Sequence, residues 1–175
     1  MEKYSRTAVK LSLLFFAIYA VFDTQTGGDV VRPITAGWML LSAMITGLRE
    51  VRRGYHPRVL AIIELALCIV GILWVVAALT VAYYDLSQVP SPGTLFGFLA
   101  FWAVHIVLMI ERVRYLKAMY VVPVLVGILG FLGNVLDVAV LKYQFDDTTT
   151  GMALPTAVFL ILLGAAAYSR ERQGP

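Results

Sequence analysis

The chain has 175 residues, of which 60% are hydrophobic and 14% are charged, and its formal net charge is +3. Soluble domains have about 45–50% apolar residues even when glycine is counted, and about 25% charged residues. A chain this short cannot bury so much apolar surface, because small folds have a high ratio of surface to volume. The composition therefore excludes a soluble globular enzyme, a disordered tail and a fibrous protein, and it predicts a polytopic membrane protein.

Six apolar stretches follow one another along the chain, and their hydrophobicity is continuous rather than alternating. Continuous runs indicate membrane helices, since the strands of a membrane barrel would alternate. A helix needs about 20 residues to cross the bilayer core, with a range of about 17–25. We therefore predict an all-α bundle of six transmembrane helices in a single membrane domain, 1–175. The predicted spans are 8–22, 33–48, 59–83, 94–110, 118–141 and 152–168.

The first stretch has an alternative interpretation as a signal peptide. It has a basic start and an apolar run, and residues 18–20 form a tolerable cleavage site. We favour the membrane span.

The lysines and arginines predict the orientation of the helices. If the helices alternate, twelve of the fourteen basic residues fall on one side, and only Arg32 and Lys142 fall on the other. Basic residues accumulate in cytoplasmic loops, so both termini are expected in the cytoplasm of a cell-membrane protein. This distribution also explains the net positive charge without nucleic acid as a partner. The twelve are Lys3, Arg6, Lys10, Arg49, Arg52, Arg53, Arg58, Arg112, Arg114, Lys117, Arg170 and Arg172.

A faint repeat marks the inner ends of the second, fourth and sixth stretches. The phrases Arg-Glu-Val-Arg at 49–52, Glu-Arg-Val-Arg at 111–114 and Arg-Glu-Arg at 170–172 recur about every 60 residues. Duplication of a helical hairpin would produce this spacing. The simpler explanation is that any inward helix end attracts basic residues.

Glu64 and His105 are ionisable residues inside predicted spans. Each lies six residues from the inner end of its helix, or about 9 Å at 1.5 Å per residue. The two helices are consecutive and antiparallel, so the side chains lie at the same depth. A hydrogen-bonded pair would satisfy both, and it could carry a proton because histidine titrates near neutrality. The alternative is a static role, with Glu64 paired to Arg58 or Arg112.

Helical spacing predicts which faces of these two helices point inward. Glu64, Cys68 and Gly71 share one face, and Phe98, Trp102 and His105 share the matching one. We interpret the aromatic stripe as packing rather than as a ligand cage. The single cysteine excludes an intrachain disulfide and a cysteine-based zinc site.

The fifth stretch carries small residues followed by polar ones. Gly127, Gly130 and Gly133 recur at steps of three, and small residues let membrane helices approach closely. Asn134 and Asp137 follow near the outer end. They could contact an ion or substrate beside a broken helix. The competing interpretation is structural, with Asp137 paired to Arg32.

Two classes of function remain. The first is a protein that binds or moves a small solute or ion, using Glu64, His105, Asn134 and Asp137. The second is a non-catalytic partner or assembly subunit, or a homo-oligomer, whose small-residue faces dock other helices. We expect no enzyme, cofactor or bound metal, because no catalytic or metal-binding motif occurs. Besides the lipid bilayer itself, anionic lipid head groups could bind at Arg49, Arg52, Arg53 and Arg58.

Overall fold

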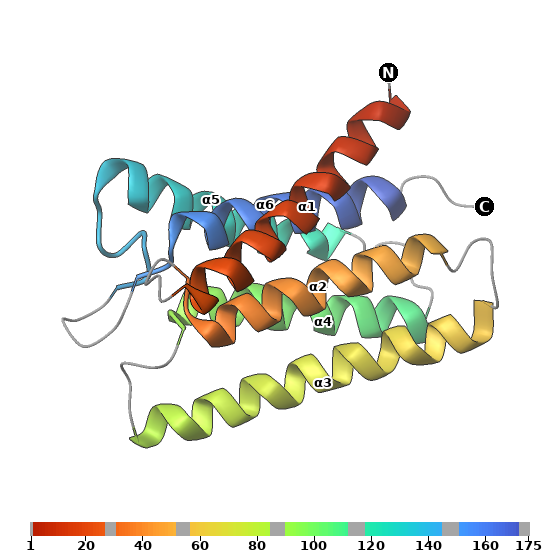
Figure 1. The fold of residues 1–175 in the computed structure, drawn as a ribbon, viewed down its shortest axis with the longest axis horizontal. Helices are drawn as coiled ribbons and strands as arrows, with labels where there is room; N and C mark the ends of the chain where they lie inside the picture. Colours follow the sequence, from red (N-terminus) through yellow and green to blue (C-terminus); the bar gives the residue numbers. More distant parts are fainter. Residues whose placement is uncertain are drawn as a thin grey trace.

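The computed structural model describes residues 2–26, 31–51, 57–84, 90–111, 118–144 and 151–171. These residues form six α-helices, which confirms the predicted all-α class (Figure 1). Prolines begin α2, α3 and α4, where the missing N–H costs no hydrogen bond. The helices are α1 (Glu2–Gln25), α2 (Pro33–Val51), α3 (Pro57–Tyr84), α4 (Pro92–Glu111), α5 (Val121–Leu136) and α6 (Leu154–Glu171).

Three helices of the described chain are long and apolar enough to cross a membrane. The qualifying segments are Arg58–Thr80, Pro92–Met109 and Ala118–Leu136. The apolar segments of the other helices are shorter, namely Leu11–Gln25, Pro33–Leu48 and Leu154–Tyr168. The structure therefore supports a membrane protein with three candidate spans and three shorter apolar helices.

The helices form three antiparallel hairpins, α1–α2, α3–α4 and α5–α6 (Figure 1). Helices α2, α4 and α6 run in one direction and contact one another at the centre. Each odd-numbered helix packs on two of these central helices, and in the described ranges no odd helix contacts another. The start of α1 and the end of α6 lie at the same end of the bundle.

Burial follows from this arrangement. The peripheral α3 buries one narrow stripe, in which residues 64, 68, 71, 75 and 78 recur at alternating steps of four and three. Its outer face carries exposed apolar side chains such as Ile62 and Leu73. An apolar surface of this extent is not stable in water and suits contact with lipid.

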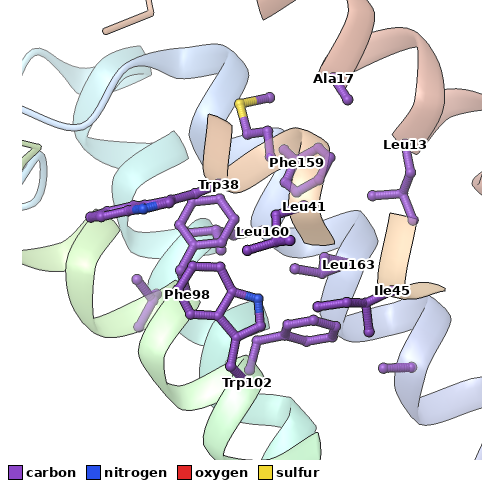
Figure 2. Packing of buried hydrophobic residues seen from close by; sticks show 14 of the residues in the cluster. Leu13, Ala17, Trp38, Leu41, Ile45, Phe98, Trp102, Phe159, Leu160 and Leu163 are labelled. Carbon is purple, nitrogen blue, oxygen red and sulfur yellow. The ribbon is translucent and has the colours of Figure 1, made fainter. Parts of the chain in front are cut away.

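Aromatic side chains fill the centre of the bundle, where α2, α4 and α6 meet. The rings of Trp38 and Trp102 pack edge to face with their centroids 6.1 Å apart. Phe98 lies against both tryptophans and against Phe159 of α6, at 5.7 to 6.0 Å (Figure 2). All four side chains are fully buried. The predicted inward aromatic stripe of α4 is therefore packing, as expected.

The three glycines of α5 lie against neighbouring backbone and side chains. A Cβ at Gly127 would lie 2.6 Å from the backbone oxygen of Ala157 in α6. One at Gly130 would lie 2.5 Å from the sulfur of Met152, and one at Gly133 would lie 2.5 Å from the backbone nitrogen of Lys142. The glycine face therefore serves packing within this chain, against α6 and the segment that precedes it.

Helix α5 ends at Leu136, five residues before the predicted end at 141. Asp137 adopts the left-handed conformation, with φ 54° and ψ 40°. Its N–H and that of Val138 both donate to the carbonyl of Gly133, which is a common way to close a helix. The apolar residues 138–141 therefore form turns that fold back over the helix end, and hydrophobicity alone overestimated the length of the span.

We predict that Gly127→Ala destabilises the protein by about 1–3 kcal/mol, because the added methyl group meets backbone that cannot move aside. Gly47→Ala in α2 is the matched control, since no neighbouring atom lies within 4 Å of the added carbon. Alanine favours the helix by up to about 1 kcal/mol over glycine, so the control should be neutral or stabilising. Thermal unfolding in detergent measures both, and equal effects would contradict the close packing of α5 on α6.

Candidate functional site

Glu64 and His105 are in direct contact in the interior of the bundle. The Nε2 atom of His105 hydrogen-bonds to Oε1 of Glu64. The side chain of Glu64 is fully buried and that of His105 is 2% exposed. The structure thus brings together the two residues that the sequence placed at equal depth, and it places Cys68 and Gly71 on the same buried face.

Tyr120 is a third member of this cluster, and sequence analysis missed it. Its hydroxyl lies 2.9 Å from Nδ1 of His105, so the imidazole bridges Glu64 and Tyr120. Tyr120 is fully buried and immediately precedes α5. Tyrosine near a helix end is ordinarily explained by the membrane interface, so its sequence position gave no sign of a buried partner.

Helix packing fixes the geometry of the cluster. The ring of Phe101 lies 5.6 Å from that of His105 and 6.0 Å from that of Tyr120. A Cβ at Gly164 of α6 would lie 2.7 Å from the backbone oxygen of Tyr120, so α6 holds that backbone closely. The Glu64–His105–Tyr120 cluster therefore joins α3, α4 and the start of α5, and α6 packs against the backbone of Tyr120.

Three buried polar atoms have no hydrogen-bond partner in the described part of the chain. They are Nε1 of Trp38, Nε1 of Trp102 and Oγ of Ser42. Trp102 precedes His105 by three residues on α4, a rise of about 4.5 Å. Both indole nitrogens are donors only, so a water molecule or another acceptor is needed to satisfy them. The bundle centre is therefore more polar than its hydrophobic composition suggests.

Asn134 has structural partners at the outer end of α5. Its Nδ2 donates to the carbonyls of Gly130 and Met152, both at 2.8 Å. The side chain of Tyr143 packs over Gly93, and its hydroxyl donates to the carbonyl of Val126 at 3.3 Å. The space beside the α5 glycines is occupied by other parts of this chain.

Asp137 is exposed at the end of α5. Its side chain is 90% exposed and forms an ion pair of 2.5 Å with Lys142, instead of the pair with Arg32 that we considered. The hydrogen bond and the charge of Lys142 lower the pKa of Asp137 below its ordinary value. A lowered pKa stabilises the fold above the ordinary value, and this contribution is lost as the pH falls through the lowered one. Because the pair is exposed, solvent screens it strongly.

The remaining candidate residues lie mostly at the limits of the described chain. Arg52 and Arg53 fall outside the described residues, as does the side chain of Arg49, while that of Arg58 is exposed. The predicted site for anionic lipid is therefore untested. Within the described ranges, no group of three or more His, Cys, Asp or Glu side chains could hold a metal ion.

No protein-family model matches the sequence, and no curated protein or solved structure is similar enough to indicate a relationship.

We predict that Glu64→Gln and His105→Gln are strongly non-additive in their effects on thermal stability. Removing one partner of a buried pair costs about 3–5 kcal/mol because the other is left uncompensated. Once one partner is gone, the second substitution should cost much less, since residues in contact couple by about 0.5–3 kcal/mol. A double-mutant cycle of unfolding free energies measures this coupling, and simple additivity would show that the two residues act independently.

Proposed function

We propose that this chain crosses the cell membrane six times with both termini in the cytoplasm, and that it binds or moves a small solute or ion. In this proposal the Glu64–His105 pair gains and loses a proton as part of that process. The observation that carries the proposal is the direct contact of two almost fully buried ionisable side chains within two candidate spans. Ionisable groups inside a membrane are costly and commonly mark ion pathways or proton relays.

The net charge of the Glu64–His105 pair explains why the pair is suited to proton exchange. A Glu–His pair that shares one acidic proton is net neutral, whether the proton lies on the carboxyl group or on the imidazole. Neutrality is favourable where the surroundings are apolar, since an isolated charge there is expensive. Loss of that proton leaves a net charge of −1 in a place that tolerates charge poorly. Proton exchange is therefore well suited to coupling with the movement of another charge or of a polar solute.

Unpartnered polar atoms on α4 and α2 support a polar function for the interior of the bundle. Trp102 and Ser42 offer hydrogen bonds that nothing in the described chain accepts. An acceptor group on a small solute, or water that accompanies it, would satisfy them. A purely structural core would gain stability from apolar side chains at these positions.

The alternative function, a partner or assembly subunit, loses its main support. That alternative rested on small-residue faces that could dock other helices. The α5 glycines already pack against α6 and the residues before it, so they are not open to a second protein. A non-enzymatic binding or transport role is the proposal that we carry forward.

The six-span topology is testable with single cysteines in a Cys68→Ser background. We expect cysteines at Gly28, Gln88 and Thr149 to react in intact cells with an impermeant thiol reagent. Cysteines at Gly54 and Tyr115 should react only after the cells are opened. Ser91 is unsuitable as a reporter because it is buried and caps α4 through Thr94. Labelling of only the second group in intact cells would overturn the orientation. Labelling of both groups would overturn the number of spans.

Proton exchange is testable by measuring melting temperature against pH for a panel of cations and small polar solutes. On the proposed function, at least one solute raises the melting temperature of the wild type by mass action, and the rise depends on pH. Glu64→Gln should abolish the pH dependence, because without the carboxylate a proton on His105 would be a buried positive charge with no compensating partner. Asp137→Asn is the matched carboxyl-to-amide control, and it should behave as the wild type.

Two outcomes would contradict the proposal. If Glu64→Gln keeps the wild-type pH dependence, the Glu64–His105 pair does not exchange the relevant proton. If only Asp137→Asn loses the pH-dependent rise in melting temperature, the site is at Asp137 and not at Glu64 and His105.

A further inference from the structure

We propose that Tyr120 is a positioning residue of the Glu64–His105 site, whose hydroxyl changes from hydrogen-bond donor to acceptor when the pair takes up its proton. This inference rests on the proposed function. It describes how proton uptake by the pair would change a hydrogen bond at the start of α5. It begins from the 2.9 Å contact between the Tyr120 hydroxyl and Nδ1 of His105.

The chemistry of the imidazole requires the reversal. A neutral imidazole has one nitrogen that donates and one that accepts. When Glu64 is an ionised carboxylate and His105 is neutral, Nε2 carries the hydrogen and donates to Glu64. Nδ1 then has a lone pair, and the Tyr120 hydroxyl must donate to it.

Addition of one proton from water gives two arrangements. In one, the carboxylate remains and both ring nitrogens of His105 carry hydrogen. In the other, the carboxyl group of Glu64 is protonated and donates to Nε2, so the ring hydrogen lies on Nδ1. In both arrangements Nδ1–H donates to the Tyr120 oxygen, and the hydroxyl hydrogen of Tyr120 becomes available to another acceptor. Only the one proton is added, and no oxidation or other co-reactant is involved.

The position of Tyr120 makes this reversal consequential. The residue is fully buried, lies at the start of α5, and its backbone oxygen is held against Gly164 of α6. Glu64 and His105 belong to the α3–α4 hairpin, whereas Tyr120 leads into the α5–α6 hairpin. A change in the Tyr120 hydrogen bond therefore links protonation of the Glu64–His105 pair to the contact between the α3–α4 hairpin and the α5–α6 hairpin.

Among the side chains that the structure describes, few other titratable groups lie on the elements around the cluster. On the elements packed around it, the described side chains include Cys68 one turn along α3, Arg58 at the inner end of α3, and Tyr168 near the inner end of α6. The described side chains of α2 add no titratable group. Cysteine, tyrosine and arginine ordinarily ionise above about pH 8, whereas histidine titrates near neutrality. A signal between about pH 5 and 8 therefore reports the Glu64–His105 pair.

The test uses the full chain in lipid nanodiscs with His56→Gln, which leaves His105 as the single histidine. Nitrogen-15 NMR of the labelled histidine shows which ring nitrogen carries hydrogen at each pH. Infrared difference spectra with isotope-labelled tyrosine show whether a tyrosine hydroxyl donates or accepts. We expect the Nε2–H form at high pH, protonation of Nδ1 at low pH, and a tyrosine band that changes with the same midpoint.

Tyr120→Phe keeps the ring and removes the hydroxyl. It should abolish the tyrosine band and change the proton affinity of His105 by about three- to tenfold, the size expected for one hydrogen bond. Tyr143→Phe is the matched control, because it also removes one phenol hydroxyl, but that hydroxyl donates to the backbone carbonyl of Val126 instead of bonding to His105. It should leave both the band and the midpoint unchanged.

The outcomes separate this inference from the proposed function. If His105 titrates and responds to Glu64→Gln, but no tyrosine band follows it or Tyr120→Phe keeps the wild-type midpoint, Tyr120 is only a packing residue and the inference fails alone. If the labelled histidine does not titrate in the wild type, the proposed function and the inference fail together. If Tyr120→Phe does not fold, the wild-type spectra still show whether a tyrosine hydroxyl changes with the same midpoint as His105.

Discussion

The absence of a side chain at Gly71 controls how closely α3 approaches α4. A Cβ at that position would lie 2.7 Å from the indole ring of Trp102, so only glycine permits the observed packing. The close packing of α3 on α4 affects contacts on both sides of Gly71. Towards the inner end, Glu64 reaches His105, and towards the centre, Trp102 packs against Trp38 and Phe98. The polar cluster and the aromatic core thus depend on the same contact.

Sequence reasoning located the inner pair because depth in a membrane can be counted from helix ends, and because buried charge has few ways to be satisfied. It also identified the packing faces, since helical spacing determines which residues share a side. It could not identify Tyr120, which lies 15 residues from His105 and is recruited only when α5 packs against α4. It also misplaced Asp137. The end of α5 depends on one left-handed residue and two hydrogen bonds to Gly133, which leave no trace in the hydrophobic pattern.

The faint repeat in the sequence falls on one helix of each hairpin. The phrases at 49–52, 111–114 and 170–172 coincide with the ends of α2, α4 and α6, the three helices that meet at the centre. Each hairpin contributes one central and one peripheral helix, and each peripheral helix packs on two of the central ones. Duplication of a hairpin stays one interpretation of the repeat, beside the accumulation of basic residues at inward helix ends. The Glu64–His105 pair belongs to one hairpin, since α2 and α6 carry no histidine.

The peripheral helices differ markedly in their apolar length. The apolar segment of α3 has 23 residues, which corresponds to about 35 Å, whereas that of α1 runs only from Leu11 to Gln25, or about 22 Å. The hydrocarbon core of a bilayer is about 30 Å thick. On the proposed six-span topology, the membrane would have to be thick beside α3 and thin beside α1, unless the whole bundle tilts towards its shorter side. Such hydrophobic mismatch costs a fraction of a kcal/mol per ångström. The inclination of the molecule, and with it the depth at which the buried pair lies, should therefore vary with the lipids that surround it.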